Sequence, residues 1–490
     1  MSILKKLAGQ TAIYGLSSVL GRMLNYLLVP LYTSRLSGFS ESDYGIVTEL
    51  YAYVAFLNII YVYGLETAYF RFSKEGKHFF YVAFTSILVS SIALSGLAWI
   101  AAQDIASLLG YPDRGYFVQW LAAILAVDAI VAIPFAKLRE ERKAVRFAVF
   151  KLTNIGINIS LNLFFILFCP WVLDKYPEHI LSAIYNPTLG VGYVFLSNLI
   201  ANSLYLILFI PTWKKVKLNL RKTEWIRMIN YAWPVLIIGF AGVTNEMLSR
   251  ALLKYRLPEG FYGAYSNLEI LGIFGACYKL SVFMTLAVQA FRYAFEPFFF
   301  AQAKENNSSM VFRNVMTYFV LFTSFSWLVL CLFMPYYAPI FLRQESYLTA
   351  LDAVPWLLGG GLFLGVFYNL SLWYKLTDKT RYGAFISLLG ASSTFVLNWV
   401  LIPAYGYMGS AYTTFATYLL MVFVSYFWGK KHYPIPYHIP KIAGYILLAG
   451  VGVTLNEIIR PSFLLAIGIT LIFLTLTFLI ERKNLIRIRS

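Results

Sequence analysis

The sequence predicts an all-α, polytopic membrane protein with about 14 transmembrane helices. Of its 490 residues, 59% are apolar or aromatic and 13% are charged, roughly half the ~25% charge of a soluble domain. Apolar stretches of about 20 residues, enough to cross ~30 Å of hydrocarbon, recur along the whole chain. Between them, Lys and Arg alternate from loop to loop as they do in membrane proteins.

Each apolar stretch is taken as one span, and the first is expected to be an uncleaved helix rather than a signal peptide. The spans are predicted at residues 11–33, 44–70, 79–101, 116–136, 152–172, 190–212, 228–252, 262–300, 314–337, 353–374, 382–403, 409–429, 442–457 and 462–480. The eighth is too long for a straight crossing. It extends past the bilayer or bends near Pro297.

The distribution of charge over the loops predicts their orientation. An even number of spans puts both termini on one side, and the segments on that side carry 29 of the 40 Lys and Arg residues. The opposite loops carry 7 and the spans 4. Because cytoplasmic loops are enriched in Lys and Arg, we predict that both termini are cytoplasmic. The net charge of +17 then follows from topology, and no nucleic-acid partner is expected.

Several functional classes are disfavoured by what the loops and cysteines contain. The longest loop, 173–189, is too short for a soluble domain, and the chain has no G-x-x-x-x-G-K-[ST] phosphate loop. Cys169, Cys277 and Cys331 lie in apolar runs and form no disulfide framework, and the four histidines are too dispersed for a zinc site. We therefore expect neither an enzyme nor a resident cofactor, with coupling to Na⁺ or H⁺ left open.

Short matches recur in the same order in two parts of the chain and indicate an internal repeat. They pair Ser42-Asp43-Tyr44-Gly45 with Gly260-Phe261-Tyr262-Gly263, Lys137-Leu138 with Lys375-Leu376, and Leu161-Asn162-Leu163 with Leu397-Asn398-Trp399. The repeat predicts a six-helix lobe at 1–222, a second at 223–430, and two additional helices at 431–490. Because six is even, the lobes form a parallel repeat, and such lobes commonly enclose a central substrate cavity.

Ten charged residues lie within the predicted spans, where a charge at the bilayer centre costs at least ~2.5–3.5 kcal/mol. They are Arg22, Glu49, Glu66, Asp128, Glu246, Arg250, Glu269, Lys279, Arg292 and Glu296. All except Asp128 belong to the first, second, seventh and eighth helices. This concentration predicts one shared polar interior.

The cations among these residues are the candidates for binding an anionic substrate. On the first helix Ser18, Arg22 and Asn25 share a polar face, and Arg22 is too deep in the span to reach water easily. A guanidinium offers paired donors to the oxygens of an anionic group such as phosphate; the alternative is a structural Arg bonded to a neighbouring helix. Arg250, Lys279 and Arg292 complete the candidate cationic cavity. Arg250 follows Glu246 by four residues, so the two either neutralise each other or Glu246 holds Arg250 until substrate competes.

Buried carboxylates are the candidates for ion coupling, because they bind a proton or Na⁺. Asp128, Glu66 and Glu246 have this position. The alternatives are that Asp128 pairs with an Arg or Lys and that Glu66 pairs with Arg71. Asparagines at 154, 158 and 162 on the fifth helix and at 198 and 202 on the sixth are expected to form hydrogen bonds between helices.

The sequence also resembles a known family. Gly15-Leu-Ser-Ser-Val-Leu-Gly21-Arg22, Tyr44-Gly45, Ser249-Arg250 and Phe261-Tyr262-Gly263-Ala264-Tyr265-Ser266 are similar to segments of bacterial oligosaccharide flippases, which belong to a superfamily with the multidrug and toxin extrusion (MATE) exporters and the lipid II flippase. The resemblance covers essentially the whole chain. It implies two lobes that rock around a cationic cavity in the bacterial cytoplasmic (inner) membrane.

The residues and the resemblance together predict a flippase. Its cargo would be polyprenyl-pyrophosphate-linked oligosaccharide, moved by alternating access from the cytoplasmic to the periplasmic leaflet for O-antigen or capsule assembly. Membrane lipids and polysaccharide assembly proteins are the partners this implies. The alternatives are a lipid II flippase, a MATE-type exporter, whose cationic cargo suits an Arg- and Lys-rich cavity poorly, and a membrane glycosyltransferase, whose usual large external loop or acidic motif is not seen.

Overall fold

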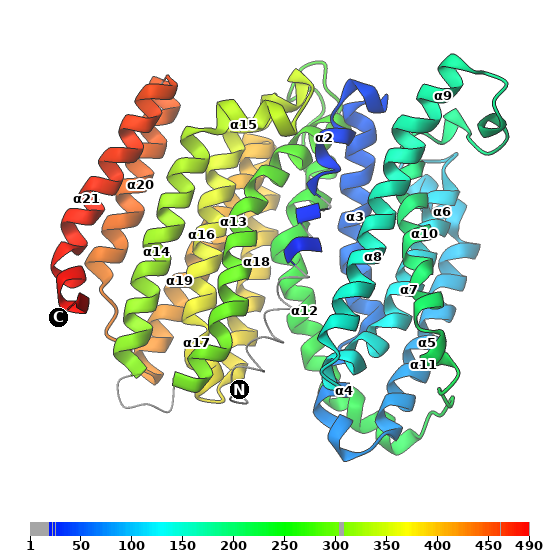
Figure 1. Ribbon diagram of the computed structural model, residues 1–490, viewed down its shortest axis with the longest axis horizontal. Helices are drawn as coiled ribbons and strands as arrows, with labels where there is room; N and C mark the ends of the chain where they lie inside the picture. Colours follow the sequence, from blue (N-terminus) through cyan, green and yellow to red (C-terminus); the bar gives the residue numbers. More distant parts are fainter. Residues whose placement is uncertain (1–18, 22, 25, 303–307, 461, 490) are drawn as a thin grey trace. The chain divides into compact units, whose positions relative to one another are not determined.

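The computed structural model describes residues 19–489 apart from 22, 25, 303–307 and 461. Within these residues the chain is helical, with short connecting loops (Figure 1), and twelve segments are long and apolar enough to cross a membrane. The shorter apolar helix α10 (Gly192–Leu208) is a further crossing candidate. The predicted first span, 11–33, lies largely outside the described residues. The predicted all-α class is confirmed, and the described spans are compatible with about 14.

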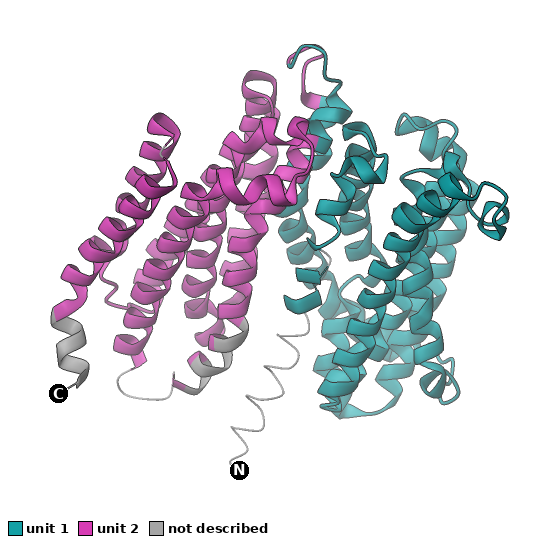
Figure 2. Cartoon of the chain, turned by 45° about the horizontal axis from the view of Figure 1, so that its top comes forward, with its two compact units in different colours: residues 1–255, 262–272 teal, residues 256–261, 273–490 magenta. Residues whose placement is uncertain are grey.

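The chain divides into two compact units (Figure 2). Unit 1 comprises residues 1–255 and 262–272, and unit 2 comprises 256–261 and 273–490. The lobes at 1–222 and 223–430 and the pair of helices at 431–490, drawn from the sequence repeat, stay a prediction. The thiols of Cys169, Cys277 and Cys331 are all buried and free.

The helices before the end of unit 1 are α2 (Val29–Tyr32), α3 (Glu41–Val62), α4 (Leu65–Phe72), α5 (His78–Ile100), α6 (Ala102–Leu108), α7 (Gly115–Glu140), α8 (Ala144–Leu163), α9 (Cys169–Lys175), α10, α11 (Ile210–Trp213) and α12 (Lys222–Arg256). One π-helical turn, Phe164–Phe168, joins α8 to α9. The buried core of this unit contains Leu65, Ile87, Ile133 and Met228, so α4, α5, α7 and the first part of α12 surround it.

The later helices are α13 (Asn267–Gln302), α14 (Ser308–Leu332), α15 (Met334–Phe341), α16 (Val354–Leu370), α17 (Leu372–Leu376), α18 (Thr380–Tyr405), α19 (Tyr407–His432), α20 (Ile439–Ile459) and α21 (Phe463–Arg489). A 3₁₀ segment, Glu345–Ala353, leads into α16. Almost every residue of α16 is buried, which makes it the core helix of unit 2. α13 has 36 residues, or about 54 Å of helix, and so is longer than the ~30 Å hydrocarbon layer.

Helices α3 and α13 begin with the same capping arrangement. Ser40 and Asp43 form reciprocal side chain–backbone hydrogen bonds of 3.1 Å each, and Ser266 and Glu269 repeat this with distances of 2.7 and 3.3 Å. Both pairs are capping boxes, which satisfy backbone N–H groups at a helix start. The predicted start of the eighth span at residue 262 is therefore wrong by five residues, because Tyr262 and Gly263 form a turn before α13.

Two asparagines that the sequence repeat pairs share their burial and one hydrogen bond in the structure. Asn162 on α8 and Asn398 on α18 are both fully buried. Each donates its side-chain amide to the backbone carbonyl four residues earlier, that of Asn158 or Thr394, at 2.8 Å. The shared burial and bonding support the parallel repeat.

The start of α13 crosses α3 very closely within unit 1. A Cβ atom added to Gly272 would overlap the backbone carbonyl of Glu41, and one added to Gly45 would overlap the carbonyl of Leu268. Only glycine leaves room for two helix backbones at this separation. Gly45 and Gly272 therefore allow α3 and α13 to pack with their backbones in contact.

Candidate functional site

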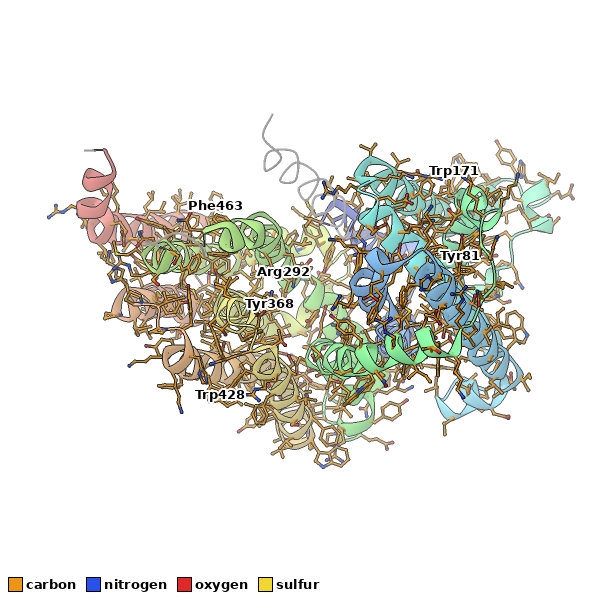
Figure 3. All side chains as sticks on the ribbon, turned by 90° about the horizontal axis from the view of Figure 1, so that it is seen from below. Tyr81, Trp171, Arg292, Tyr368, Trp428 and Phe463 are labelled. Atoms are coloured by element: carbon orange, nitrogen blue, oxygen red, sulfur yellow. The ribbon has the colours of Figure 1, made fainter. Side chains whose placement is uncertain are left out.

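A polar pocket lies within unit 2 between α13, α16 and α17. The pocket is partly open, and the cavity between residues of these helices has a volume of about 20 Å³. These residues are Val288, Phe291, Arg292, Phe299, Gly365, Tyr368, Asn369, Leu372 and Lys375. Seen along the helices, Arg292 and Tyr368 lie side by side among the helices of unit 2 (Figure 3). The pocket combines two cations and an amide with aliphatic and aromatic walls.

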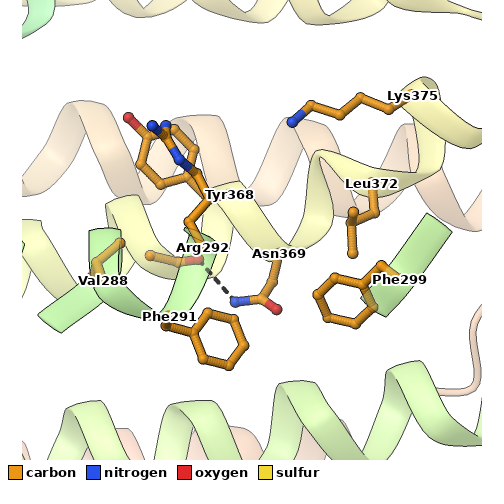
Figure 4. A pocket seen from close by; sticks show the side chains of 9 residues that line it. Val288, Phe291, Arg292, Phe299, Tyr368, Asn369, Leu372 and Lys375 are labelled. Atoms are coloured by element: carbon orange, nitrogen blue, oxygen red, sulfur yellow. Dashed lines mark hydrogen bonds between the residues drawn. The ribbon is translucent and has the colours of Figure 1, made fainter. Parts of the chain in front are cut away.

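The two cations reach the pocket from different helices. The guanidinium carbon of Arg292, on α13, lies 4.9 Å from the centroid of the Tyr368 ring, a distance at which a cation–π interaction holds the side chain in place. Lys375, on α17, extends its ammonium group toward the same space (Figure 4). The pocket therefore concentrates positive charge against apolar walls, where electrostatic attraction to an anion is stronger than in bulk water.

Asn369 supplies the pocket with an acceptor. Its side chain is 5% exposed, and its amide nitrogen donates to the carbonyl of Gly365 at 3.2 Å (Figure 4). Its buried amide oxygen has no hydrogen-bond partner within the described part of the chain. A buried acceptor left unmatched costs free energy, so a ligand hydroxyl or N–H in this pocket would be favoured. The site thus suits a ligand with an anionic group and a neighbouring donor.

The predicted cations do not all lie in this pocket. Arg292 lines it, whereas Lys279, thirteen residues earlier on α13, is half-buried and does not. Arg250 is a residue of unit 1 on α12, 7% exposed. Ser18, Arg22 and Asn25 lie outside the described residues. The proposed role of these six residues in one cationic cavity stays a prediction.

The contact between Arg250 and Glu246 differs from the expected carboxylate–guanidinium pair. Nη2 of Arg250 donates to the backbone carbonyl of Glu246 at 2.9 Å, and the Glu246 side chain is exposed. The carbonyl contact holds Arg250 against its own helix. It leaves the carboxylate of Glu246 on the surface of unit 1.

Asp128 belongs to a hydrogen-bonded chain that joins three helices of unit 1. The Asn202 amide on α10 donates to the Asp128 carboxylate on α7 at 3.0 Å. The Asn154 amide on α8 donates in turn to Asn202 at 2.9 Å. The predicted hydrogen bonds between the fifth and sixth helices are therefore present. Asp128 accepts from an amide here, and Lys151 is its electrostatic neighbour.

Glu66 pairs with a different partner from the one considered from the sequence. Its carboxylate forms an ion pair with Arg139, near the end of α7. Arg71, the partner considered from the sequence, instead has its Nη1 atom 4.0 Å from Oε1 of Glu75. The Arg139 guanidinium also lies 5.1 Å from the ring centroid of Phe70. Glu66 is thus already neutralised by a cation in the structure, which makes it a weaker ion-coupling candidate than Asp128.

Unit 1 contains a buried acid–base cluster of which the sequence pattern indicates only one charged member. Glu49 on α3 is fully buried and accepts from Lys254 at 2.8 Å, from Tyr53 at 2.9 Å, from Tyr255 at 2.8 Å and from Tyr111. We call these five residues the Glu49 cluster. Glu49 stood out as a charge within a span, but Lys254 lies just past the predicted end of its span and Tyr111 lies in a loop. No short-range pattern connects them.

Comparisons with known proteins agree with this fold. A family model described as polysaccharide biosynthesis protein matches residues 35–173. No curated protein matches the sequence. Among solved structures, the lipid II flippase MurJ in an inward closed conformation is similar with a TM-score of 0.70 and 14% identity, covering 96% of this chain and 99% of that one.

MATE transporters share the fold less closely. VcmN of Vibrio cholerae matches with a TM-score of 0.57 and 12% identity over 87% of this chain and 97% of its own. An inward-facing multidrug resistance MATE transporter of the MOP superfamily matches with a TM-score of 0.54 and 13% identity, over 86% of this chain and 94% of its own. The expected resemblance is confirmed at the level of the fold: the chain is a multi-pass membrane protein with the fold of MurJ and the MATE transporters, and its residues 35–173 match the polysaccharide biosynthesis model.

Proposed function

We propose that the protein is a flippase that moves polyprenyl-pyrophosphate-linked oligosaccharide from the cytoplasmic to the periplasmic leaflet of the bacterial inner membrane. The transported units would serve the assembly of a surface polysaccharide, O-antigen or capsule. The family-model match to a polysaccharide biosynthesis protein and the likeness of the whole fold to a lipid II flippase support this substrate class. Polysaccharide assembly proteins are the proposed partners.

The observation that carries the proposal is the pocket of Arg292, Lys375 and Asn369. A pyrophosphate offers several oxygens to a guanidinium fork and an ammonium group. The first sugar, joined directly to that pyrophosphate, carries hydroxyl donors within reach of the buried Asn369 oxygen. The apolar walls strengthen both interactions by excluding water. Arg22, Asn25, Ser18, Arg250 and Lys279 are proposed further contacts for the same headgroup as it crosses.

Ion coupling is proposed for Asp128 ahead of Glu66 and Glu246. Asp128 accepts from the neutral amide of Asn202. Lys151 acts on it electrostatically, but within the described residues no ion pair joins the two. Glu66 has Arg139 as its counterion, and Glu246 is exposed. A buried carboxylate without a bonded counterion is open to a proton or Na⁺, whereas one in an ion pair is not.

The test uses a strain in which the gene is deleted. Lipid-linked glycans are extracted and identified by mass spectrometry, and surface polysaccharide is measured in parallel. We expect polyprenyl-pyrophosphate oligosaccharide to accumulate and the surface polymer to disappear. Wild type and Arg381→Gln, a basic residue outside the pocket on α18, should restore the polymer, whereas Arg292→Ala and Lys375→Ala should not. Restoration by both pocket variants at normal expression would refute the site.

A lipid II flippase is the second candidate, because MurJ gives a TM-score of 0.70 over nearly the full length of both chains. The same extraction separates the two. Accumulated lipid II with arrested cell-wall synthesis would support the second candidate. Unchanged glycolipids with increased sensitivity to cationic dyes would instead indicate a drug exporter of the MATE type.

A further inference from the structure

A deep apolar groove lies within unit 2, separate from the Arg292 pocket. Its fifteen lining side chains are aliphatic or aromatic and come from α14, α16, α19, α20 and the loop before α20. Examples are Met316, Val366, Phe423 and Ala443. The groove has a volume of about 460 Å³. A groove of this character takes hydrocarbon.

The length of the groove along its helices corresponds to one leaflet of a bilayer. On α20 its lining runs from Ile439 to Leu447, and on α19 from Leu419 to Phe427. Each stretch of eight residue steps covers about 12 Å along its helix, close to half of the ~30 Å hydrocarbon layer. Both stretches lie next to the connection between α19 and α20, so the groove occupies only the half of unit 2 on that side. By the charge rule this is the cytoplasmic half.

Positive charge gathers at the end of the groove next to the connection between α19 and α20. Arg313 on α14 and Lys441 on α20 both act electrostatically on His438, which directly precedes the lining residue Ile439. Burial lowers the pKa of His438, and the nearby cations Arg313 and Lys441 lower it further, while Glu481 opposes them. Glu481 also forms an ion pair with Lys441 at 2.6 Å. Lys430 and Lys431, at the end of α19, add two more cations to this side.

We propose that this groove binds a diacyl phospholipid with an anionic headgroup. Its acyl chains would lie along α16, α19 and α20, and its phosphate would lie near Arg313 and His438. Basic pockets between transmembrane helices on the cytoplasmic side are typical binding sites for such headgroups. A single-leaflet length suits an acyl chain, whereas a polyprenyl chain is much longer than one leaflet. The bound lipid fills the space between α20 and the rest of unit 2 and so stabilises their packing.

The experiment measures binding to the full-length purified protein. Delipidated protein in neutral detergent is titrated with phosphatidylglycerol, phosphatidylethanolamine or undecaprenyl phosphate. Retained lipid is counted by native mass spectrometry, and the Tm is recorded at each concentration. We expect phosphatidylglycerol to bind with one-to-one stoichiometry and to raise the Tm. Phosphatidylethanolamine, which lacks net charge, should bind about fivefold more weakly, the effect of roughly one charge contact.

Three variants locate the site. Arg313→Gln removes a headgroup cation and should weaken phosphatidylglycerol binding about fivefold. Ala443→Phe fills the groove and should abolish the one-to-one adduct while the protein still elutes as a folded species. Arg381→Gln, on α18 at the same side but not in the groove, is the matched control and should bind like wild type.

Two results would overturn the proposal. One is equal binding of phosphatidylglycerol to wild type, Arg313→Gln and Ala443→Phe, which would place the lipid elsewhere. The other is preferential binding of undecaprenyl phosphate that is lost in Ala443→Phe, which would assign the groove to the polyprenyl carrier. Loss of the phosphatidylglycerol adduct in Ala443→Phe, with the control unaffected, would support it.

Discussion

At the scale of single residues, the Glu49 cluster shows how a charge is accommodated inside unit 1. Both oxygens of the Glu49 carboxylate accept hydrogen bonds, from Lys254 and from tyrosine hydroxyls. Lys254 also donates to the carbonyl of Leu109 at 2.7 Å. Burial raises the pKa of Tyr111, and the Glu49 carboxylate raises it further, so this hydroxyl stays protonated and donates. The cluster joins α3, the end of α12 and the loop before α7.

Removing one member of this pair is expected to destabilise the protein far more than removing both. Lys254→Met leaves a buried carboxylate without its cation and should lower the free energy of unfolding by about 3–5 kcal/mol. The double variant Glu49→Gln/Lys254→Met replaces the ion pair by neutral groups and should recover most of that loss. Unfolding of the purified protein in mixed micelles measures both.

The control for this prediction is Lys430→Met, an exposed residue at the end of α19. It should change stability by less than about 0.5 kcal/mol. A double variant as unstable as Lys254→Met alone would mean that the tyrosines, rather than the ion pair, hold the cluster together.

We expect that another positively charged side chain cannot fully replace Arg292. Arg292→Lys keeps a cation in the pocket but loses the planar group that stacks on Tyr368 and the paired donors for phosphate. We expect about a tenfold weaker apparent affinity for the lipid-linked substrate, the loss of roughly one charge-assisted hydrogen bond. Binding of the extracted glycolipid to purified variants measures this. Equal affinity in Arg292→Lys would show that only the charge is used.

At the scale of helices, the sequence predicts where helices form better than it predicts which side chains bond between them. Runs of apolar residues predict each described span because lipid exposure requires them. The ion pair between Glu66 and Arg139 joins residues 73 positions apart, and that between Glu49 and Lys254 joins residues 205 apart. Periodicity carries no information about such distant contacts, so the nearer Arg71 was the partner considered. Local signals such as Ser266 and Glu269 do set a helix start, but an apolar run beginning at residue 262 obscured it.

The close crossing of α3 and α13 gives a prediction for glycine substitutions. Gly272→Ala places a methyl group against the carbonyl of Glu41 and should destabilise the protein by about 1–3 kcal/mol, as overpacking does. Gly242→Ala is the matched control, because no atom lies within 4 Å of its added Cβ and it too is in a helix. That change should leave stability equal or raise it by up to about 1 kcal/mol. Unfolding midpoints in detergent compare the two, and similar midpoints would contradict the crossing.

At the scale of the whole molecule, some residues that the sequence repeat pairs have matching local contacts in the structure. Asn162 and Asn398 have the same burial and the same hydrogen bond, and the capping boxes of α3 and α13 correspond. The functional contacts do not follow the repeat. The Arg292 pocket belongs to unit 2 and the Glu49 cluster to unit 1. The two units thus carry different polar sites, which is why a repeat in the sequence could not predict where these sites lie.

The charge distribution makes one prediction about the whole chain that reporter fusions test directly. The loop between α6 and α7 carries a single cation, Arg114, whereas residues 137–151 around the next turn carry six. Cytoplasmic loops retain positive charge, so alkaline phosphatase fused after residue 113 should be active and the same fusion after residue 142 inactive. Green fluorescent protein fused after residue 490 should fluoresce, because it folds in the cytoplasm. The reverse pattern would invert every span, place the anionic-lipid groove in the outer leaflet and remove the basis for inward-to-outward flipping.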